Sequence, residues 1–481
     1  MMIFSIAKYG KKDKYTRICH IKILKKTPNI RKQDNQTGDK VMNIILLSGG
    51  SGKRLWPLSN ETRSKQFLKV LKDPEGKPES MIQRVYRQIM EASIESNIVV
   101  ATGKSQKDSI RSQLGSKADV VFEPERRDTF PAIVLSCAYL AYEKGLNENE
   151  VVIVLPVDPY ADTDYFKSLV KMEQAVKANT ANLGLMGIKP TYPSAKYGYI
   201  IPSKDGTVER FQEKPSEEYA DKLIQEGAMW NGGVFAFKLK YMLNIAKKYA
   251  HFATFEEIRA KYSDLPKISF DYEVVEKESS IAMIEYRGLW KDLGTWNTLT
   301  EVMDSKALGK VILADTCNNT HVINELDIPV TVLGINDAVV AASPDGILVS
   351  DKGESSYLKP YVEKIQQRPM YEEREWGEYK VLDYVVYGDG TSSLTKSLFI
   401  RAGKSISYQS HAIRDEIWTI VDGTGDLLID GHIRNVRRGD VAYITKGQKH
   451  AIRATSDLRL IEVQIGLELV ETDIERYNWQ W

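Results

Sequence analysis

Residues 47–58 read Leu-Ser-Gly-Gly-Ser-Gly-Lys-Arg-Leu-Trp-Pro-Leu, directly after the apolar segment 43–46, and residues 63–67 read Arg-Ser-Lys-Gln-Phe. A strand that gives way to glycines and then to fixed cations can hold a nucleoside triphosphate. Small residues leave room for phosphate, backbone amides bind it, and cations neutralise its charge. The stretch therefore predicts a phosphate-binding loop in which Arg54 and Lys65 supply positive charge.

Two common phosphate loops do not fit these glycines. A Walker loop needs Ser or Thr after Gly-Lys, but Arg54 follows Lys53, and the first glycine of that motif would fall on Leu47. A dinucleotide-binding fingerprint needs a third glycine where Leu55 stands. Both interpretations are excluded.

The stretch resembles the signature of the mannose-1-phosphate guanylyltransferases, which is close to L-S-G-G-x-G-T-R-L-W-P-L-S followed by P-K-Q-F. The resemblance implies a Rossmann-like nucleotidyltransferase domain with a mostly parallel sheet. It also implies catalytic roles for Arg54 and Lys65. The nucleotide-binding residues that it implies in this loop are Ser48, Gly49, Gly50 and Gly52.

Length and composition set the class of protein. A chain of 481 residues is too long to fold around one hydrophobic core, and its length suggests about three domains. Hydrophobic residues make up 42% and charged residues 27%, which is typical of a soluble globular protein. No apolar run approaches the roughly 18 residues of a membrane helix, so we expect no membrane partner. The three cysteines form no CxxC pair, which favours a reducing cytoplasm.

The N-terminal 41 residues differ in charge from the rest of the chain. They carry a net charge of +8, which leaves −7 for the remainder. A basic arm of this kind could contact nucleic acid or anionic lipid, but it lacks interleaved aromatic residues and a helical apolar face. We expect residues 1–41 to be a disordered extension without a nucleic-acid partner.

Alternating strands and helices follow this extension as far as about residue 300. The apolar pattern predicts strands at 43–48, 97–102, 119–123, 151–158 and 183–188, and helices at 79–93 and 131–144. Such alternation indicates a parallel sheet covered on both faces, with ligands at the carboxyl ends of its strands. We expect three folded domains: an α/β domain at 42–305, a small β connector and linker at 306–365, and an all-β barrel at 366–481.

Two acidic motifs suggest a metal site. Residues 152–158 end a buried strand in Asp158, and residues 290–296 place Asp292 in a glycine turn. In the guanylyltransferases the corresponding motifs are L-P-S-D and W-x-D-V-G-S-W, and both aspartates bind Mg²⁺. The resemblance implies that Asp158 and Asp292 are catalytic and bind Mg²⁺, although Val157 and Pro159 depart from the usual neighbours of the first aspartate.

Four further motifs resemble the family's sugar and nucleotide contacts. Residues 211–215 match F-x-E-K-P, 230–233 resemble W-N-S-G, and 195–200 resemble T-G-Y-G-Y-I. These imply sugar-phosphate binding by Gly198, Glu213, Lys214 and Asn231. Residues 123–132 resemble E-P-x-x-R-N-T-A-P-A and imply nucleotide binding by Arg127 and Asp128. A carboxylate at 128 is compatible with guanine but does not prove it.

These motifs imply transfer of GMP from GTP to mannose 1-phosphate by in-line displacement, which gives GDP-mannose and pyrophosphate. The attacking phosphate is already ionised at neutral pH, so no general base is needed. Two alternatives stay open: a pyrophosphorylase for another hexose 1-phosphate or base, and a non-catalytic sugar-nucleotide-binding regulatory protein. The family likeness also suggests a homodimer.

The last segment resembles the cupin half of the bifunctional type II mannose-6-phosphate isomerase/guanylyltransferases. Gln409 and His411, two apart on a strand, point the same way and can converge with Glu416 and His450 on Zn²⁺ or another divalent ion. The family reads L-Q-x-H-H-H-R-A-E-H-W here, but Ala412, Ile413 and Ile417 replace three histidines. Isomerase activity is therefore left open. The alternative is a metal-free barrel that only stabilises the protein.

Overall fold

The computed structural model describes residues 41–50, 52–203 and 207–481. The predicted disordered extension, residues 1–41, lies outside the described residues except for Val41. Within the described ranges, no helix has the length and apolar character needed to span a bilayer.

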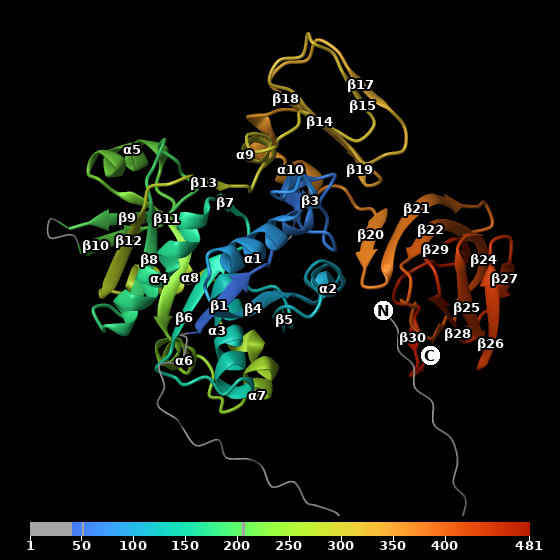
Figure 1. Ribbon diagram of the computed structural model, residues 1–481, viewed down its shortest axis with the longest axis horizontal. Helices are drawn as coiled ribbons and strands as arrows, with labels where there is room; N and C mark the ends of the chain where they lie inside the picture. The colour runs from blue at the N-terminus through green and yellow to red at the C-terminus, as the bar shows by residue number, and fades with distance from the viewer. Residues whose placement is uncertain (1–40, 51, 204–206) are drawn as a thin grey trace, which may run out of the picture. The chain divides into compact units, whose positions relative to one another are not determined.

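A nine-stranded sheet forms the centre of the first domain (Figure 1). Its strand order is β10-β9-β11-β6-β1-β4-β5, and β8 joins it by pairing with β11 and β12. β1 runs parallel to β4 and β6, whereas β11 runs antiparallel to β6, β8 and β9. The strands are β1 (Met42–Leu47), β4 (Ser96–Gly103), β5 (Asp119–Glu123), β6 (Val151–Pro156), β8 (Leu183–Ile188), β9 (Tyr199–Pro202), β10 (Val208–Gln212), β11 (Met229–Lys238) and β12 (Ile281–Tyr286).

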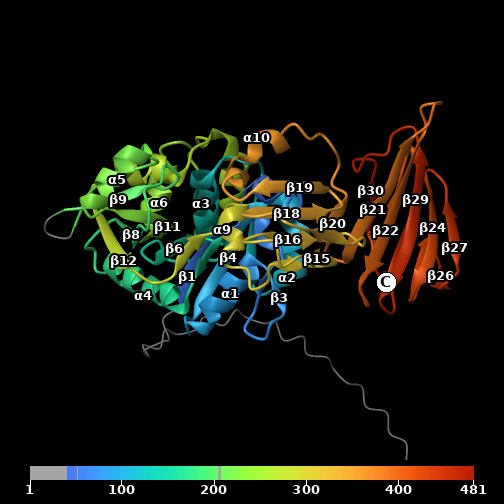
Figure 2. The ribbon, with the colours of Figure 1, turned by 90° about the horizontal axis from the view of Figure 1, so that it is seen from above.

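Helices cover both faces of this sheet, as Figure 2 shows. Ile44 and Leu46 of β1 pack with residues of α1 and α4, while Ile45 packs on the other face with residues of α3 and α6. Alternate residues of a strand point to opposite faces, so a continuously apolar strand is required here. The helices are α1 (Met81–Glu91), α2 (Lys107–Leu114), α3 (Thr129–Ala138), α4 (Thr163–Lys177), α5 (Glu217–Gln225), α6 (Leu239–Ala246), α7 (Phe255–Ala260), α8 (Phe270–Glu273) and α9 (Trp296–Thr300).

The predicted helix at 131–144 starts earlier and ends differently. Asp128 is its N-cap, and its carboxylate accepts a hydrogen bond from the Thr129 amide. After Ala138 the chain continues as a π-helical turn at Tyr139–Glu143. The N-cap preference of aspartate accounts for the earlier start.

Two short strand pairs supplement the main sheet. β2 (Leu71–Lys72) pairs with β3 (Pro78–Glu79), and β7 (Pro159–Ala161) pairs with β13 (Trp290–Asp292). The second pair joins segments far apart in the sequence, and it determines the geometry of the candidate site.

The connector contains two small sheets, in keeping with the small β connector predicted there. Its four-stranded sheet has the order β14-β16-β18-β19, and β15 pairs with β17. Leu55 and Leu58 of the first domain share a buried cluster with Ile323, Val339 and Leu348 of the connector. The strands are β14 (Ala307–Leu308), β15 (Val311–Leu313), β16 (His321–Asn324), β17 (Val330–Val332), β18 (Ala338–Ser343) and β19 (Gly346–Asp351), followed by α10 (Lys359–Val362).

The C-terminal domain consists of two antiparallel sheets that share one apolar core, in agreement with the predicted cupin class. The six-stranded sheet contains β20 (Tyr371–Arg374), β21 (Gly377–Val386), β22 (Ser392–Ile400), β29 (Leu458–Gly466), β24 (Arg414–Asp422) and β27 (Val441–Ile444). The five-stranded sheet contains β26 (His432–Arg437), β25 (Thr424–Ile429), β28 (His450–Ala454), β23 (Gln409–Ser410) and β30 (Glu475–Arg476).

Candidate functional site

The glycine-rich loop follows β1 and is fixed by side chains from two other segments. Gln66 Nε2 donates to the Ser48 carbonyl at 2.7 Å, and Gln106 Nε2 donates to the Gly50 carbonyl at 3.3 Å. Gly52 has φ +67°, and a Cβ there would lie 2.7 Å from both the Asn60 carbonyl oxygen and the Ser64 Cα. Only glycine fits this position, because both the φ angle and the neighbouring backbone exclude a side chain.

Asp158 and Asp292 are brought together by the β7–β13 pair. Asp292 is the register partner of Pro159, and the Leu293 amide donates to the Asp158 carbonyl at 3.3 Å. Both aspartates line a cavity of about 150 Å³. The two predicted acids therefore share one cavity although they are far apart in the chain.

Lys65 is the cationic partner of these acids. Its Nζ lies 2.5 Å from Asp158 Oδ2. Burial opposes the charged ammonium, but Asp158 and then Asp292 outweigh it and raise the pKa of Lys65. Burial alone would raise the pKa of Asp158, yet Lys65 lowers it. The Asp292 pKa is raised by burial and by Asp158, against the opposing effect of Lys65. Arg54, which is exposed, contributes to the potential at both carboxylates.

A larger cavity of about 450 Å³ opens beside the glycine loop. Gly49, Gly50, Lys65 and Asp158 line it together with the predicted nucleotide-binding residues Arg127 and Asp128. The Arg127 guanidinium donates to the Leu265 carbonyl and to Glu125. Asp128 has φ +71°, an uncommon conformation for a residue other than glycine.

Sequence reasoning missed several polar residues that line this cavity. Glu123 accepts a hydrogen bond from Tyr262 at 2.8 Å, and burial raises its pKa. Gln66 and Lys267 also face the cavity. Glu123 and Gln66 lie inside the recognised motifs and could have been found there, whereas Lys267 belongs to no such motif.

The predicted sugar-phosphate residues form a second group. The Asn231 amide donates to the Gly198 carbonyl at 2.8 Å, and Lys214 Nζ donates to Glu213 Oε1 at 2.5 Å. A Cβ on Gly198 would lie 2.5 Å from Glu213 Oε2 and from the Phe211 ring, so a larger residue there would displace both side chains. Asn231 lines the 150 Å³ cavity with Asp158 and Asp292, and the two cavities share Pro156 and Asp158.

Asp271 joins this group and was not predicted. Asn231 Nδ2 donates to Asp271 Oδ1 at 2.7 Å. Burial and then the Glu213 carboxylate raise the pKa of Asp271 to about 7. Asp271 lies at the start of α8, far in sequence from Asn231, so no local motif indicated this contact.

Aromatic rings surround the same small cavity. Tyr197 lies 4.7 Å from Trp230 and 5.8 Å from Trp290, measured between ring centroids. Tyr197 and Trp290 line the cavity. Apolar ring faces beside carboxylate and amide groups match the two kinds of surface of a sugar.

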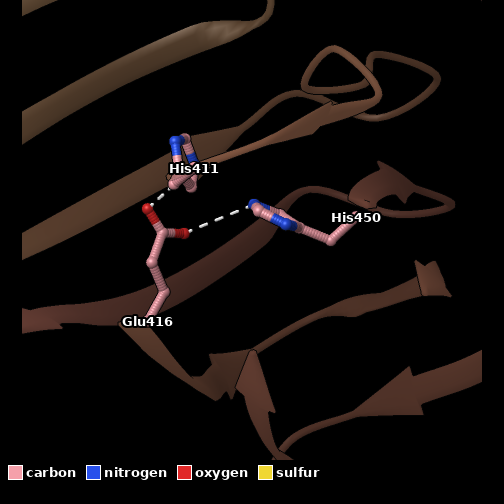
Figure 3. Close-up of side chains that lie close together, drawn as sticks. All are labelled: His411, Glu416 and His450. Carbon is pink, nitrogen blue, oxygen red and sulfur yellow. Dashed lines mark ion pairs between the residues drawn. The ribbon is translucent and has the colours of Figure 1, made fainter. Parts of the chain in front are cut away.

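The C-terminal domain contains a separate cluster of His411, Glu416 and His450, shown in Figure 3. One potential ligand atom from each lies within 4.8 Å of the others, and all three residues are buried. His411 Nε2 lies 3.1 Å and His450 Nε2 lies 3.5 Å from the Glu416 carboxylate. Gln409 Nε2 lies 3.4 Å from His411 Nε2. The four predicted metal-binding residues are therefore adjacent.

Backbone carbonyls orient both imidazoles of this cluster. His411 Nδ1 lies 2.6 Å from the Asp473 carbonyl oxygen, and His450 Nδ1 lies 3.0 Å from that of Gln448. A carbonyl only accepts hydrogen bonds, so each Nδ1 carries a proton, and in a neutral imidazole Nε2 then presents a lone pair. His450 Nε2 is buried without a hydrogen-bond partner among the described residues. Such a lone pair suits a cation.

Arg414 and Glu462 extend the cluster into a cavity of about 570 Å³. Arg414 Nε donates to Glu416 Oε1 at 2.9 Å. Trp418 Nε1 donates both to Glu416 and to Glu462. Burial and then the Glu416 charge raise the pKa of Glu462 to about 8.

Two family profiles match the chain. The nucleotidyl transferase profile matches residues 43–307, which is more than half of the chain, and the mannose-6-phosphate isomerase C-terminal profile matches residues 363–479. This chain belongs to the nucleotidyl transferase family. The resemblance stated from the motifs is confirmed, and the second match agrees with the all-β C-terminal domain.

Individual relatives of this nucleotidyl transferase span both domains. Mannose-1-phosphate guanylyltransferase of Salmonella montevideo is 29% identical, over 90% of this chain and 98% of that protein. Xanthan biosynthesis protein XanB of Xanthomonas campestris is 30% identical, over 90% of this chain and 97% of that protein. The crystal structure of mannose-1-phosphate geranyltransferase from Thermus thermophilus matches with a TM-score of 0.57 and 29% identity, over 68% of this chain and 99% of that one.

Proposed function

We propose that the chain transfers GMP from GTP to mannose 1-phosphate, giving GDP-mannose and pyrophosphate. The observation that carries this proposal is the meeting of Asp158 and Asp292 beside Lys65, where the nucleotide-sized cavity adjoins the smaller cavity. The relative from Salmonella montevideo is named for this activity. The shared cavity wall lets a sugar phosphate and a triphosphate approach each other.

The chemistry is an in-line displacement at phosphorus. A phosphate oxygen of mannose 1-phosphate forms a bond to the α-phosphorus of GTP, and the bond from that phosphorus to the bridging oxygen of pyrophosphate breaks. Lys65 and Arg54 stabilise the charge that spreads over the phosphate oxygens. Lys214 binds the sugar phosphate, while Glu213 and Asn231 bind sugar hydroxyls. Asp128, with one carboxylate oxygen committed to the Thr129 amide, offers the other to guanine.

Asp158 and Asp292 fit a divalent cation. They are two carboxylates in one cavity, and the mutual repulsion that helps to raise the Asp292 pKa would be relieved by a shared cation. Mg²⁺ held there would supply charge neutralisation for the triphosphate. Lys65 keeps Asp158 ionised in the absence of substrate, so this carboxylate is ready to bind the cation.

The test is a matrix of incubations with Mg²⁺, each nucleoside triphosphate and each hexose 1-phosphate, in which pyrophosphate release is followed. We expect the GTP and mannose 1-phosphate pair to turn over fastest. Faster release with another pair would change the substrate assignment, and no release with any pair would refute the transferase proposal. Chromatography of the same sample tests the proposed homodimer.

A second candidate function is supported by the histidine cluster. We propose that Gln409, His411, Glu416 and His450 bind Zn²⁺ or another divalent ion, and that the adjoining cavity accepts a sugar phosphate for isomerisation. The unpartnered, buried His450 Nε2 supports metal binding. Conversion of mannose 6-phosphate to fructose 6-phosphate, measured with and without a chelator, tests it. Metal binding without conversion would leave a structural metal and no isomerase.

A further inference from the structure

Arg63 makes a buried ion pair between the glycine-loop region and the connector. Its Nη1 and Nη2 lie 2.7 and 2.9 Å from the two carboxylate oxygens of Glu325. Residue 63 is 8% exposed. Burial disfavours the charged guanidinium, but the Glu325 carboxylate more than compensates and keeps the Arg63 pKa raised. A bidentate pair of this kind fixes orientation as well as distance.

Asn60 makes a second bridge next to the first. Its Nδ2 donates to Asp345 Oδ2 of the connector at 2.7 Å, while its Oδ1 accepts from the Thr62 and Arg63 amides. The Asn60 side chain therefore holds the turn at 60–63 and anchors it to the connector. In addition, Ser343 Oγ donates to the Pro57 carbonyl at 2.6 Å.

The start of the C-terminal domain joins the same contacts. Asp345 Oδ1 accepts from the Met370 amide, and the Asp345 carbonyl accepts from Gln367 Nε2, both at 2.6 Å. The Tyr371 ring lies 5.0 Å from the Arg63 guanidinium carbon. Three parts of the chain thus meet at Arg63 and Asp345.

These contacts reach the candidate catalytic residues over a very short distance. The Asn60 carbonyl oxygen and the Ser64 Cα would both lie 2.7 Å from a Cβ on Gly52, so they flank this glycine, and Lys65 follows Ser64 along the chain. Ser64 stands where the family pattern has proline, and its φ of −68° is an angle that proline would impose. Serine does not fix φ as proline does, so contacts around Ser64 contribute more to holding the backbone there.

We infer that Arg63 is a positioning residue: through Glu325 and Tyr371 it couples the phosphate-binding loop and Lys65 to the connector and to β20 of the C-terminal domain. This inference rests on the proposed transferase function for its kinetic consequences. The start of the C-terminal domain then has a role in the transfer site, because its docking positions the loop that receives the triphosphate.

The kinetic test uses Arg63→Met, which keeps the aliphatic bulk and removes the guanidinium. We expect the KM for GTP to rise by about tenfold, because a displaced loop loses aligned phosphate contacts. The KM for mannose 1-phosphate should stay within about twofold, since its site is built from other segments. Loss of folded protein would lower the apparent kcat and leave both KM values unchanged, so misfolding cannot account for a raised KM for GTP. An unchanged KM for GTP in folded Arg63→Met would overturn the inference.

Glu325→Gln leaves Arg63 charged and unpaired, and this variant risks misfolding. The double variant Arg63→Met/Glu325→Gln removes both partners. If the pair acts as a unit, the double variant has the same KM for GTP as Arg63→Met alone. A rise in KM equal to the combined effects of the two single variants would contradict a shared role. Lys310→Met, at an exposed ion pair of the same connector, is the matched control and should change neither KM.

Hydrogen–deuterium exchange separates this inference from the transferase proposal. Backbone amides in residues 49–66 should exchange faster in Arg63→Met than in the unaltered chain or in Lys310→Met, with or without catalytic activity. If the unaltered chain releases no pyrophosphate with any substrate pair, the proposed function fails while this measurement still decides the coupling. Equal exchange in all three proteins would refute the coupling through Arg63.

Discussion

The two candidate sites are assembled in contrasting ways. The candidate transfer site gathers residues from Ser48 to Asp292, which lie on or next to several strands of the α/β domain. The C-terminal cluster takes its four residues from 409–450, on or next to three strands. The first site joins segments that are far apart in the sequence, while the second joins segments from the two sheets of one small domain.

Their electrostatics differ in the same sense. Lys65 compensates Asp158 through a direct ion pair between flexible side chains. In the C-terminal cluster, backbone carbonyls orient the imidazoles, and Arg414 donates to Glu416. We therefore expect the candidate transfer site to rearrange when charged substrates bind, and the histidine cluster to keep its arrangement when a cation binds.

The largest expected effect is at the paired acids. Asp292→Asn should lower the rate of pyrophosphate release by at least about a thousandfold, because a metal ligand and a local charge are lost together. Asp327→Asn makes the same change at a carboxylate that is 89% exposed in the connector and should leave the rate unaltered. An Asp292→Asn variant with near-normal turnover would remove this residue from the site.

A smaller effect is expected for the histidine cluster. His450→Ala should weaken Zn²⁺ binding at least about a hundredfold, because it removes the buried, unpartnered Nε2 from the proposed ligand set. The exposed His432 of the same domain supplies the comparison variant, His432→Ala. Equilibrium dialysis with metal analysis measures both. Equal affinities in the two variants would show that His450 is not a ligand.

The glycine loop offers a matched pair of substitutions. Gly52→Ala should cost about 3 kcal/mol of stability, because the added Cβ meets backbone atoms at a positive φ. Gly50→Ala, at φ +115° with no atom within 4 Å of its Cβ, should cost about 1 kcal/mol. Denaturant unfolding measures the two costs. The reverse order would mean that the loop is not held against Asn60 and Ser64.

The smallest effect concerns pH. The pKa of Asp271 is raised to about 7 from an ordinary 3.8. As pH rises, Asp271 therefore loses its proton at a lower pH in the unfolded chain than in the folded protein. The folded state is therefore penalised increasingly between about pH 4 and pH 7. Asp271→Asn removes this penalty. Its free energy of unfolding, relative to that of the unaltered chain, should therefore rise by about 2 kcal/mol between pH 5 and pH 8, a figure reduced for partial exposure. Thermal melts in which the variant and the unaltered chain differ by the same amount at pH 5 and at pH 8 would contradict the raised pKa.

Sequence patterns predicted the parts of the sites that are local. The glycine loop and both aspartates stood in contiguous motifs, and alternation along a strand gave Gln409 and His411 a common direction. The contacts Asn231–Asp271, Glu123–Tyr262 and Arg63–Glu325 were not predicted, because each joins segments that only the folded sheet and connector bring together. Strand boundaries were close, whereas the start of α3 depended on capping by Asp128.

The central claim is that Asp158 and Asp292 hold one divalent ion, and Mn²⁺ binding measured by electron paramagnetic resonance tests it most directly. The experiment uses a His411→Ala/His450→Ala background with GTP present, so that the C-terminal cluster does not contribute. We predict that Asp158→Asn, Asp292→Asn and the double variant all lose the same nucleotide-dependent ion to the same extent. Retention of that ion in either single variant would show that the two carboxylates do not share it.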